Sequence, residues 1–223
     1  MSPKLKDFDE LMNSRFSCRA FLTKEVDQKT IDQIIKTAQK VPSWCNSQPW
    51  KVSLLRRETR ELLSKKLILS ADQTIATPDI NFPKRYAGVY KTRRSICGWQ
   101  LYNAVGVQKR DREGASRQMT KNYEFFGAPH VAIITTPGDL GAYGVLDCGA
   151  FVTAFTLAAA AVGVSSIPQA AIAGRAPIVR EVLNIEDDRD VLCAISFGFA
   201  DTGNSANSFR TQRADLTEFV EWI

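Results

Sequence analysis

The nine residues from Pro42 to Trp50 constrain this chain more than any other segment. They follow a strongly periodic helical stretch, precede an apolar run, and include two prolines, two tryptophans, two serines, an asparagine and a glutamine. Two prolines fix φ at two points and remove two backbone donors, so this polar turn is stiff. It is either an ordinary connection from a helix to a strand or a rigid wall that holds amide and hydroxyl groups toward a flat, polar-edged ligand.

The hydrophobic periodicity of the remaining chain predicts many helices and few strands. The most regular stretch is a helix over 27–41, where apolar residues recur at helical spacing after a capping Asp27. Further helices are expected over 7–13, 58–69, 146–162, 176–183 and 215–222, and strands over 52–55, 131–136 and 191–197. Few strands among many helices indicate an α+β or layered α/β domain. A chain of 223 residues suits one large core, so we expect a single domain over 1–223.

Cysteine usage and hydropathy indicate a protein of a reducing compartment. The five cysteines are odd in number, widely spaced and without a Cys-x-x-Cys pair, which argues against a disulfide framework or a structural zinc site. The first residues lack the apolar core of a signal peptide. The alanine-rich stretch 151–164 is too short for a membrane span and fits a buried helix. We therefore expect a cytoplasmic location and no membrane partner.

The chain has one histidine, His130, at the entrance of the strand expected over 131–136. It is either a hydrogen-bonded structural residue or a catalytic one. A single histidine argues against a histidine-rich metal centre, and we expect no metal site.

Charge is distributed unevenly along the chain. The net charge is +5, yet residues 80–121 hold ten basic and two acidic side chains, so this segment carries +8 and the rest of the chain −3. The segment is poorly patterned and rich in aromatic residues, and we expect an insertion with helical pieces rather than a second domain. It either attracts an anion or forms a solvated helical face. A basic character confined to one segment does not predict general nucleic-acid binding.

Two arginine clusters offer a site for a phosphate. Arg15, Ser17 and Arg19 alternate along the chain, so an extended backbone turns all three toward one side. Two guanidinium forks and a hydroxyl suit phosphate oxygens. The second cluster, 207–213, supplies two more arginines with hydroxyl and amide groups, and the two clusters could close around one phosphate. The alternative is a solvated basic loop.

Two segments in the second half of the chain need separate interpretations. After the expected core helix, Pro168 ends any helical continuation, and the small side chains of Ala170 and Ala171 leave backbone N–H groups open to a ligand. The glycines within 138–144 stand where a dinucleotide fingerprint would lie. Their spacing is not Gly-x-Gly-x-x-Gly and no clear βαβ unit follows, so we reject a Rossmann interpretation.

Taken in order, these motifs resemble the nitroreductase family of FMN-dependent NAD(P)H oxidoreductases. The matching motifs are Arg-x-Ser-x-Arg at 15–19, Pro-Ser-x-x-Asn-Ser-Gln-Pro-Trp at 42–50, Ala-Pro-His at 128–130, Asp-x-Gly at 147–149, Pro-Gln-Ala at 168–170 and Arg-x-x-Arg at 210–213. The resemblance implies an α+β fold with a central mixed, mostly antiparallel sheet flanked by helices. It also implies a domain-swapped homodimer with two FMN sites at the subunit interface.

The same resemblance implies a set of site residues. Those that correspond to FMN contacts are Arg15, Ser17, Arg19, Pro42, Ser43, Asn46, Pro168, Gln169, Ala170, Ala171 and Arg213. By this resemblance, the arginines and Ser17 correspond to contacts with the phosphate, the ribityl chain or the pyrimidine edge. The 42–46 turn corresponds to one that the second subunit lays against the same flavin. The backbone N–H groups of residues 170 and 171 correspond to those that face flavin N5 and O4. Asn122 corresponds loosely to a pyrimidine-edge contact. Trp44 and Cys45 stand where the family often has small residues and are implied to shape the substrate pocket.

The implied activity needs no acid or base side chain. NADPH or NADH donates a hydride to flavin N5, and a small aromatic acceptor, a nitroaromatic or a quinone, then takes electrons at the same place, which implies ping-pong kinetics. The basic segment corresponds to a lid that could recognise a dinucleotide phosphate. Within the family the alternatives are a reductive dehalogenase or an oxidase; outside it, a flavin-binding or nucleic-acid-binding module. We expect a homodimer without a nucleic-acid partner.

Overall fold

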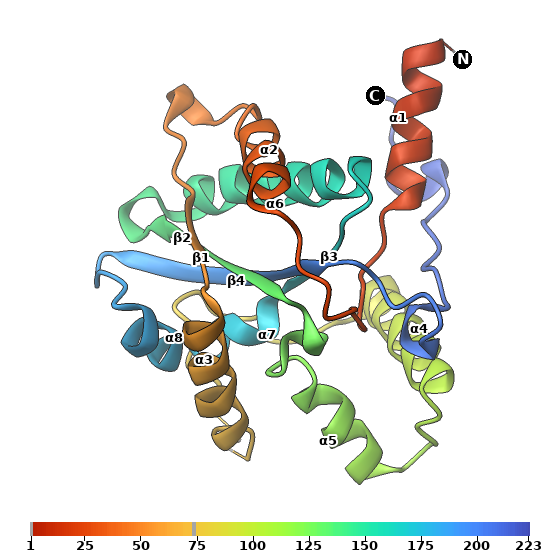
Figure 1. Ribbon diagram of the computed structural model, residues 1–223. Coiled ribbons are helices and arrows are strands. Elements are labelled where there is room, and N and C mark those ends of the chain that lie inside the picture. Colours follow the sequence, from red (N-terminus) through yellow and green to blue (C-terminus); the bar gives the residue numbers. More distant parts are fainter. Residues whose placement is uncertain (1, 73–74) are drawn as a thin grey trace.

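The computed structural model describes residues 2–72 and 75–223, and it places one antiparallel sheet between two layers of helices (Figure 1). The strands run in the order β1-β2-β4-β3. Their bounds are β1 Lys51–Leu54, β2 His130–Pro137, β3 Ser165–Gln169 and β4 Arg189–Gly198. One face is covered by α2 (Gln28–Ala38) and α6 (Gly141–Ala161), and the other by α3 (Arg57–Leu69), α7 (Ala170–Ala173) and α8 (Ala176–Leu183). The α+β fold expected from the sequence is confirmed.

The sheet separates two hydrophobic cores. Successive side chains of a strand point to opposite faces. In β2, Val131 and Ile133 therefore pack toward α3 and α8, whereas Ala132 and Ile134 pack toward α2 and α6. Because both faces are covered, β2 is an almost unbroken apolar run, as its sequence indicates.

Strand β3 was not expected from the sequence. It is an edge strand that pairs with β4 from Ser165↔Gly198 to Gln169↔Ala194. A proline cannot donate to a ladder and is tolerated at a sheet edge. Pro168 therefore marks the border of the sheet, although its presence in the sequence argues against a strand.

Helix α6 begins at Gly141, five residues before the start expected at 146. The extra turn needs a close approach to β2, because a Cβ on Gly144 would lie 2.8 Å from Thr136 Oγ1. Helix α6 connects β2 to β3, but these strands are not neighbours, because β4 lies between them. Every neighbouring pair in the sheet is antiparallel. The glycines of 138–144 therefore do not open a Rossmann unit.

Helix α6 has a buried side and an exposed side. Within the described residues, Gly138–Ala161 is the one stretch long and apolar enough to cross a membrane. Its buried side, with Phe151 and Phe155, packs on α2 and the sheet. The stretch is thus the core helix expected from its composition, although its other side leaves Leu146 67% exposed.

The peripheral segments carry the remaining differences. The basic segment forms α4 (Gly88–Ala104) and α5 (Arg112–Thr120), which lie apart from the two helical layers (Figure 1). Helix α1 (Pro3–Ser14) projects from the body with the C-terminus beside it (Figure 1). The helix expected over 215–222 is wrong: only Leu216–Glu218 forms a single 3₁₀ turn, because a short exposed segment without packing does not sustain a helix.

Candidate cofactor site

The fold brings the two arginine clusters together at the edge strand. The backbone N–H of Cys18 donates to Ser166 O of β3 at 3.2 Å. The side-chain oxygen of Asn207, 188 residues away from Arg19 in sequence, accepts from the Arg19 backbone N–H at 2.7 Å. Arg19 of the first cluster and Asn207 of the second are therefore in contact, and their closure around one phosphate stays a prediction.

Arg15 and Arg213, one from each cluster, lie close enough for their charges to interact. Burial, followed by the nearby charge of Arg213, lowers the pKa of the Arg15 guanidinium from its usual value. The Arg210 guanidinium stands 3.9 Å from the centre of the Phe16 ring. Across residues 2–72 and 75–223, none of the four arginines at 15, 19, 210 and 213 takes part in an ion pair. Uncompensated guanidinium groups at this spacing favour an anionic ligand.

A small cavity of about 170 Å³ adjoins the first cluster. Its walls include Arg15, Phe16, Thr156, Ala160 and Ser166. The hydroxyl of Ser166 is buried and has no hydrogen-bond partner among the described residues. A buried hydroxyl without a partner among the described residues, in the same cavity as Arg15, is a second sign that this part of the chain receives a polar ligand.

The corner between β3 and α7 lies farther along the same strand. Pro168 and Ala170 are exposed and Ala171 is half-buried. The first N–H groups of a helix have no partner within it, so those of Ala170 and Ala171 lie outside the helical ladder of α7. From Ser166 to Ala170 an extended chain covers roughly 13 Å. That span suits an elongated ligand with an anionic end and a flat head.

The side chain of Gln169 does not point to this surface. It is 3% exposed, and its amide group bonds to Ser196 and to Asn122 inside the protein. Asn122 in turn donates its own amide to Met119 O at 3.1 Å. Only the backbone of Gln169 is therefore available to a ligand at the corner.

The 42–50 turn is held in a strained conformation by one buried acid. Cys45, Asn46 and Gln48 have φ values of 50°, 56° and 47°, in the left-handed region that such residues seldom adopt. Oδ2 of Asp147 accepts from the backbone N–H of Trp44 at 3.0 Å and from the Ser47 hydroxyl at 3.4 Å.

Asp147 was not recognised as a site residue in the sequence, where it appears only within the Asp-x-Gly motif. Its position as a single charge in an otherwise uncharged helix could have identified it. It is the one charged residue of α6 and is only 8% exposed. A buried carboxylate needs polar partners, and here the turn supplies them.

The two tryptophans of the turn have different surroundings. Trp44 is 57% exposed and meets the ring of Tyr143 edge-on at a centroid distance of 4.3 Å. Trp50 instead stacks on Phe151 of the core at 5.2 Å. Pro42 and Cys45 are exposed beside Trp44, and Ser43 accepts from the Gln48 backbone N–H at 3.0 Å. The exposed half of the turn is therefore free to meet another molecule.

One chain does not bring the turn and the arginines together. The turn contacts α6 at Asp147, whereas Arg15 lines a cavity with Ala160 near the other end of that helix. Thirteen residues of α helix rise about 20 Å. Between these ends, α6 borders a groove of about 680 Å³ with Pro42, Leu146 and Leu157 among its largely apolar walls. The residues predicted from the sequence thus form two separate halves.

Residues 12–199 match the sequence model described as the Nitroreductase family. The chain belongs to the nitroreductase family. It is 33% identical over 217 residues to a 4-nitrobenzoate reductase of Pseudomonas putida, and the alignment covers 97% of this chain and 96% of that protein. It is 34% identical over 213 residues to the nitroreductase NfnB of Mycolicibacterium smegmatis, with 94% and 90% of the two chains covered.

Solved nitroreductase structures share the fold. The crystal structure of the FMN-dependent nitroreductase NfnB from Mycobacterium smegmatis in complex with NADPH superposes with a TM-score of 0.93 at 31% identity, covering 98% of this chain and 99% of that one. The FMN- and NADPH-dependent nitroreductase NfnB from sphigopyxis sp. strain HMH gives a TM-score of 0.92 at 26% identity, covering 96% of this chain and 98% of that one. The family resemblance seen in the ordered motifs is therefore confirmed.

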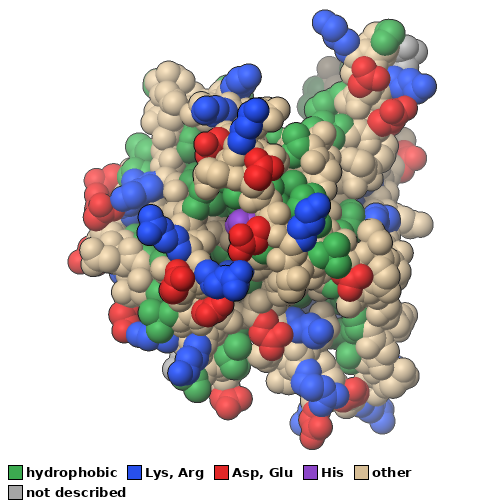
Figure 2. All heavy atoms as spheres, in the orientation of Figure 1, with side chains coloured by type: hydrophobic (Ala, Val, Ile, Leu, Met, Phe, Trp, Pro, Cys, Tyr) green, Lys and Arg blue, Asp and Glu red, His purple; other side chains and the backbone are tan. Residues whose placement is uncertain are grey.

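His130 of this nitroreductase-family chain is structural. Its Nε2 accepts from the Val26 backbone N–H at 2.9 Å, and its ring stacks on Phe197 at 5.2 Å. The imidazole lies in a recess among charged side chains (Figure 2). Burial is the main cause that lowers its pKa, which favours the neutral form that the hydrogen bond requires.

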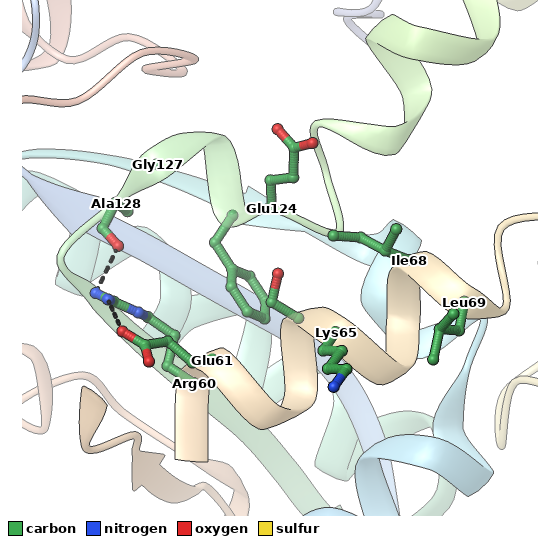
Figure 3. Close-up of a pocket in the computed structure, with 10 residues that line it drawn as sticks. Arg60, Glu61, Lys65, Ile68, Leu69, Glu124, Gly127 and Ala128 are labelled. Atoms are coloured by element: carbon green, nitrogen blue, oxygen red, sulfur yellow. Dashed lines mark hydrogen bonds and ion pairs between the residues drawn. The ribbon is translucent and has the colours of Figure 1, made fainter. Parts of the chain in front are cut away.

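A further cavity of about 440 Å³ lies between α3 and the 124–128 turn (Figure 3). The Arg60 guanidinium donates to the carbonyl oxygens of Ala128 and Pro129, while Phe125, Ile68 and Leu69 supply apolar walls. None of the residues that correspond to flavin contacts lines this cavity. It is separate from the candidate cofactor site.

Proposed function

We propose that this chain is an FMN-dependent oxidoreductase that uses NADPH or NADH to reduce nitroaromatic acceptors. The observation that carries the proposal is the group of four arginines at the sheet edge that form no ion pair within the described part of the chain, which belongs to the nitroreductase family. Relatives along almost the whole chain are named 4-nitrobenzoate reductase and nitroreductase, and a solved neighbour is FMN-dependent and holds NADPH.

The residues present fit the phosphate end of FMN. Arg15, Arg19 and Arg213 would bind the phosphate oxygens, and Ser17 would bind the ribityl chain. The buried Ser166 hydroxyl beside Arg15, to which no described residue offers a hydrogen bond, supports a polar ligand here. A bound phosphate would also relieve the repulsion between Arg15 and Arg213.

The residues of the β3–α7 corner fit the ring end. Pro168, the Gln169 backbone and the N–H groups of Ala170 and Ala171 would hold the edge of the flat ring. FMN, when bound, supplies the hydride- and electron-transfer chemistry, and the protein supplies position and electrostatics. The proposed hydride transfer requires no side chain as acid or base, and the single histidine is engaged in a structural hydrogen bond.

We further propose that the complete site forms in a domain-swapped homodimer. A second copy would supply Pro42, Ser43 and Asn46 to the flavin and place Trp44 and Cys45 in the acceptor pocket. The proposal is supported by the roughly 20 Å that separates the two halves along α6 and by the apolar groove on that helix. The tail residues that project with large exposed apolar side chains, Leu216, Phe219 and Trp222, would wrap onto the partner.

The basic segment 80–121 would act as a lid beside this site. Its helix α4 contacts the 205–207 turn, and Asn207 of that turn binds the backbone of Arg19. Arg93 is paired with Glu218 at 2.9 Å, whereas Arg94 lies 5.2 Å from the centre of the Tyr86 ring and forms no ion pair with any residue that the structure describes. Arg94 is therefore the better candidate for recognising the dinucleotide phosphate. The five unpaired cysteines support the proposed cytoplasmic location.

The absorbance spectrum of the purified protein under nitrogen tests the proposal. We expect a flavin spectrum that bleaches on addition of NADPH and recovers on addition of a nitroaromatic. Initial rates at several acceptor concentrations should give the parallel double-reciprocal lines of ping-pong kinetics. A protein that shows no flavin spectrum even after reconstitution with FMN would overturn the proposal.

A further inference from the structure

A buried polar relay crosses the sheet edge behind the proposed ring site. The hydroxyl of Ser196, fully buried on β4, donates to Gln169 Oε1. Gln169 Nε2 donates to Asn122 O at 2.9 Å and lies 3.4 Å from Asn122 Oδ1. Both hydrogen-bonding ends of the Gln169 amide are thus used within the chain.

The relay ties the end of the basic segment to the paired strands β3 and β4, to which no strand pairing of the described residues connects it. Gln169 is the last residue of β3 and the residue before α7. Asn122 stands two residues after α5, at the end of the basic segment. The register Gln169↔Ala194 turns the Gln169 side chain toward the core of α3 and α8, so its neighbours Pro168 and Ala170 face outward.

We infer that Gln169 is a positioning residue for the proposed cofactor: its buried amide fixes the 168–171 corner against β4 and against the end of the basic segment, and so holds the Ala170 and Ala171 N–H groups in place. The inference rests on the proposed function for its flavin part. A leucine of similar size would keep the packing but remove the partner of the buried Ser196 hydroxyl and leave the Asn122 carbonyl with only the Phe125 N–H as donor.

The full-length chain, as purified and after reconstitution with FMN, tests this inference in four variants. Gln169→Leu removes the relay, Ser196→Ala removes one arm, and Gln169→Glu replaces the amide by a carboxyl group. Gln118→Leu is the matched control, because Gln118 is also buried but its Nε2 has no partner among the described residues.

Hydrogen–deuterium exchange of peptides over 168–173 measures how firmly the relay holds this backbone, and it can be done without any flavin. We expect exchange at least roughly tenfold faster in Gln169→Leu, a smaller rise in Ser196→Ala and no change in Gln118→Leu. In the reconstituted protein, the reduction potential of bound FMN should shift in Gln169→Leu and not in Gln118→Leu.

The Gln169→Glu variant adds a pH signature that packing alone would not produce. A protonated carboxyl group can donate to Asn122 O as the amide does, whereas a carboxylate cannot, and burial raises a carboxyl pKa. The rate of FMN reduction by NADPH in Gln169→Glu should approach that of the unmodified protein as pH falls, while Gln169→Leu shows no such recovery.

The two proposals fail in different ways. If the unmodified protein binds no FMN, the proposed function falls, and exchange over 168–173 still decides the relay. If FMN binds but Gln169→Leu matches Gln118→Leu in exchange and in reduction potential, the inference about Gln169 is overturned.

Discussion

The carboxylate of Asp147 accepts a hydrogen bond of 3.0 Å from the backbone N–H of Trp44. This contact ties a turn with three left-handed non-glycine residues to the second turn of the core helix. Each such residue costs of the order of 1 kcal/mol or more, so the conformation persists only because its surroundings impose it. Asp147 is the side chain through which α6 does so.

We therefore expect Asp147→Ala to destabilise the protein by about 2 kcal/mol, since it removes charge-assisted hydrogen bonds from a buried position. Denaturant unfolding of the full chain measures the change. Asp139→Ala is the control, because Asp139 is exposed at the start of the same segment and should alter stability by less than about 0.5 kcal/mol. Equal effects of the two substitutions would show that Asp147 does not hold the turn.

Removing Arg213 should have opposite effects on stability and binding. Its charge disfavours the charged form of Arg15 in the protein without a ligand, so Arg213→Ala should leave the free energy of unfolding unchanged or slightly raised. Affinity for FMN should fall by roughly tenfold to a hundredfold, as expected for a lost charge-assisted contact. Flavin fluorescence titration measures the affinity. Arg56→Ala, at an exposed arginine on the opposite layer, should bind FMN normally.

Trp44→Ser should change acceptor preference more than FMN affinity. The Trp44 ring is 57% exposed and contacts Tyr143 rather than the core, so its loss leaves the fold intact. We expect the ratio of kcat/KM for a nitroaromatic and a quinone to change by about tenfold, and the Kd for FMN to change little. A large loss of FMN affinity with an unchanged acceptor ratio would mean that the role of the turn is misassigned.

Charge reversal at Arg94 should lower the preference for NADPH over NADH by roughly fivefold, about 1 kcal/mol for an exposed charge. Arg93→Glu is the informative comparison. Arg93 is already paired with Glu218, so its reversal should loosen the tail and affect the two nicotinamides alike. Steady-state kinetics with both donors gives the ratio. An unchanged ratio in Arg94→Glu excludes this role for the basic segment.

His130 should make stability depend on pH. Burial depresses its folded-state pKa below the unfolded value near 6.5, so the unfolded chain takes up the proton first. The contribution of His130 is complete above about pH 6.5 and is lost as pH falls toward the folded pKa. Unfolding free energies between pH 8 and 5.5 should fall in the unmodified protein and fall less in His130→Phe, which keeps a ring on Phe197 without titrating.

The sequence predicted those elements whose pattern is local. Helix α8 has the expected bounds, and the buried run of β2 follows from its apolar residues. Strand β3 was missed because a serine pair and Pro168 resemble a loop until pairing with β4 is known. The C-terminal helix was wrong because its apolar spacing has nothing to pack against in the chain itself.

The same limit applies to the candidate site. The arginines at 15, 19 and 213 could be chosen because guanidinium chemistry is visible in a short motif. The burial of the Gln169 side chain could not, because it depends on the register of β3 against β4 and on a residue 47 positions away. Asp147 is an intermediate case. An isolated charge in an apolar helix predicts that a polar partner exists, but the sequence does not indicate which residue it is.

Placing Pro168 on the outermost strand has a consequence for how this protein avoids aggregation. An open strand edge is a template on which another chain can add. Along the outer side of β3, Ser17 bridges Ser166, and two positions farther on Pro168 has no N–H to offer a foreign strand. The border of the sheet thus stays accessible to a small molecule while it remains a poor template for a second β-strand.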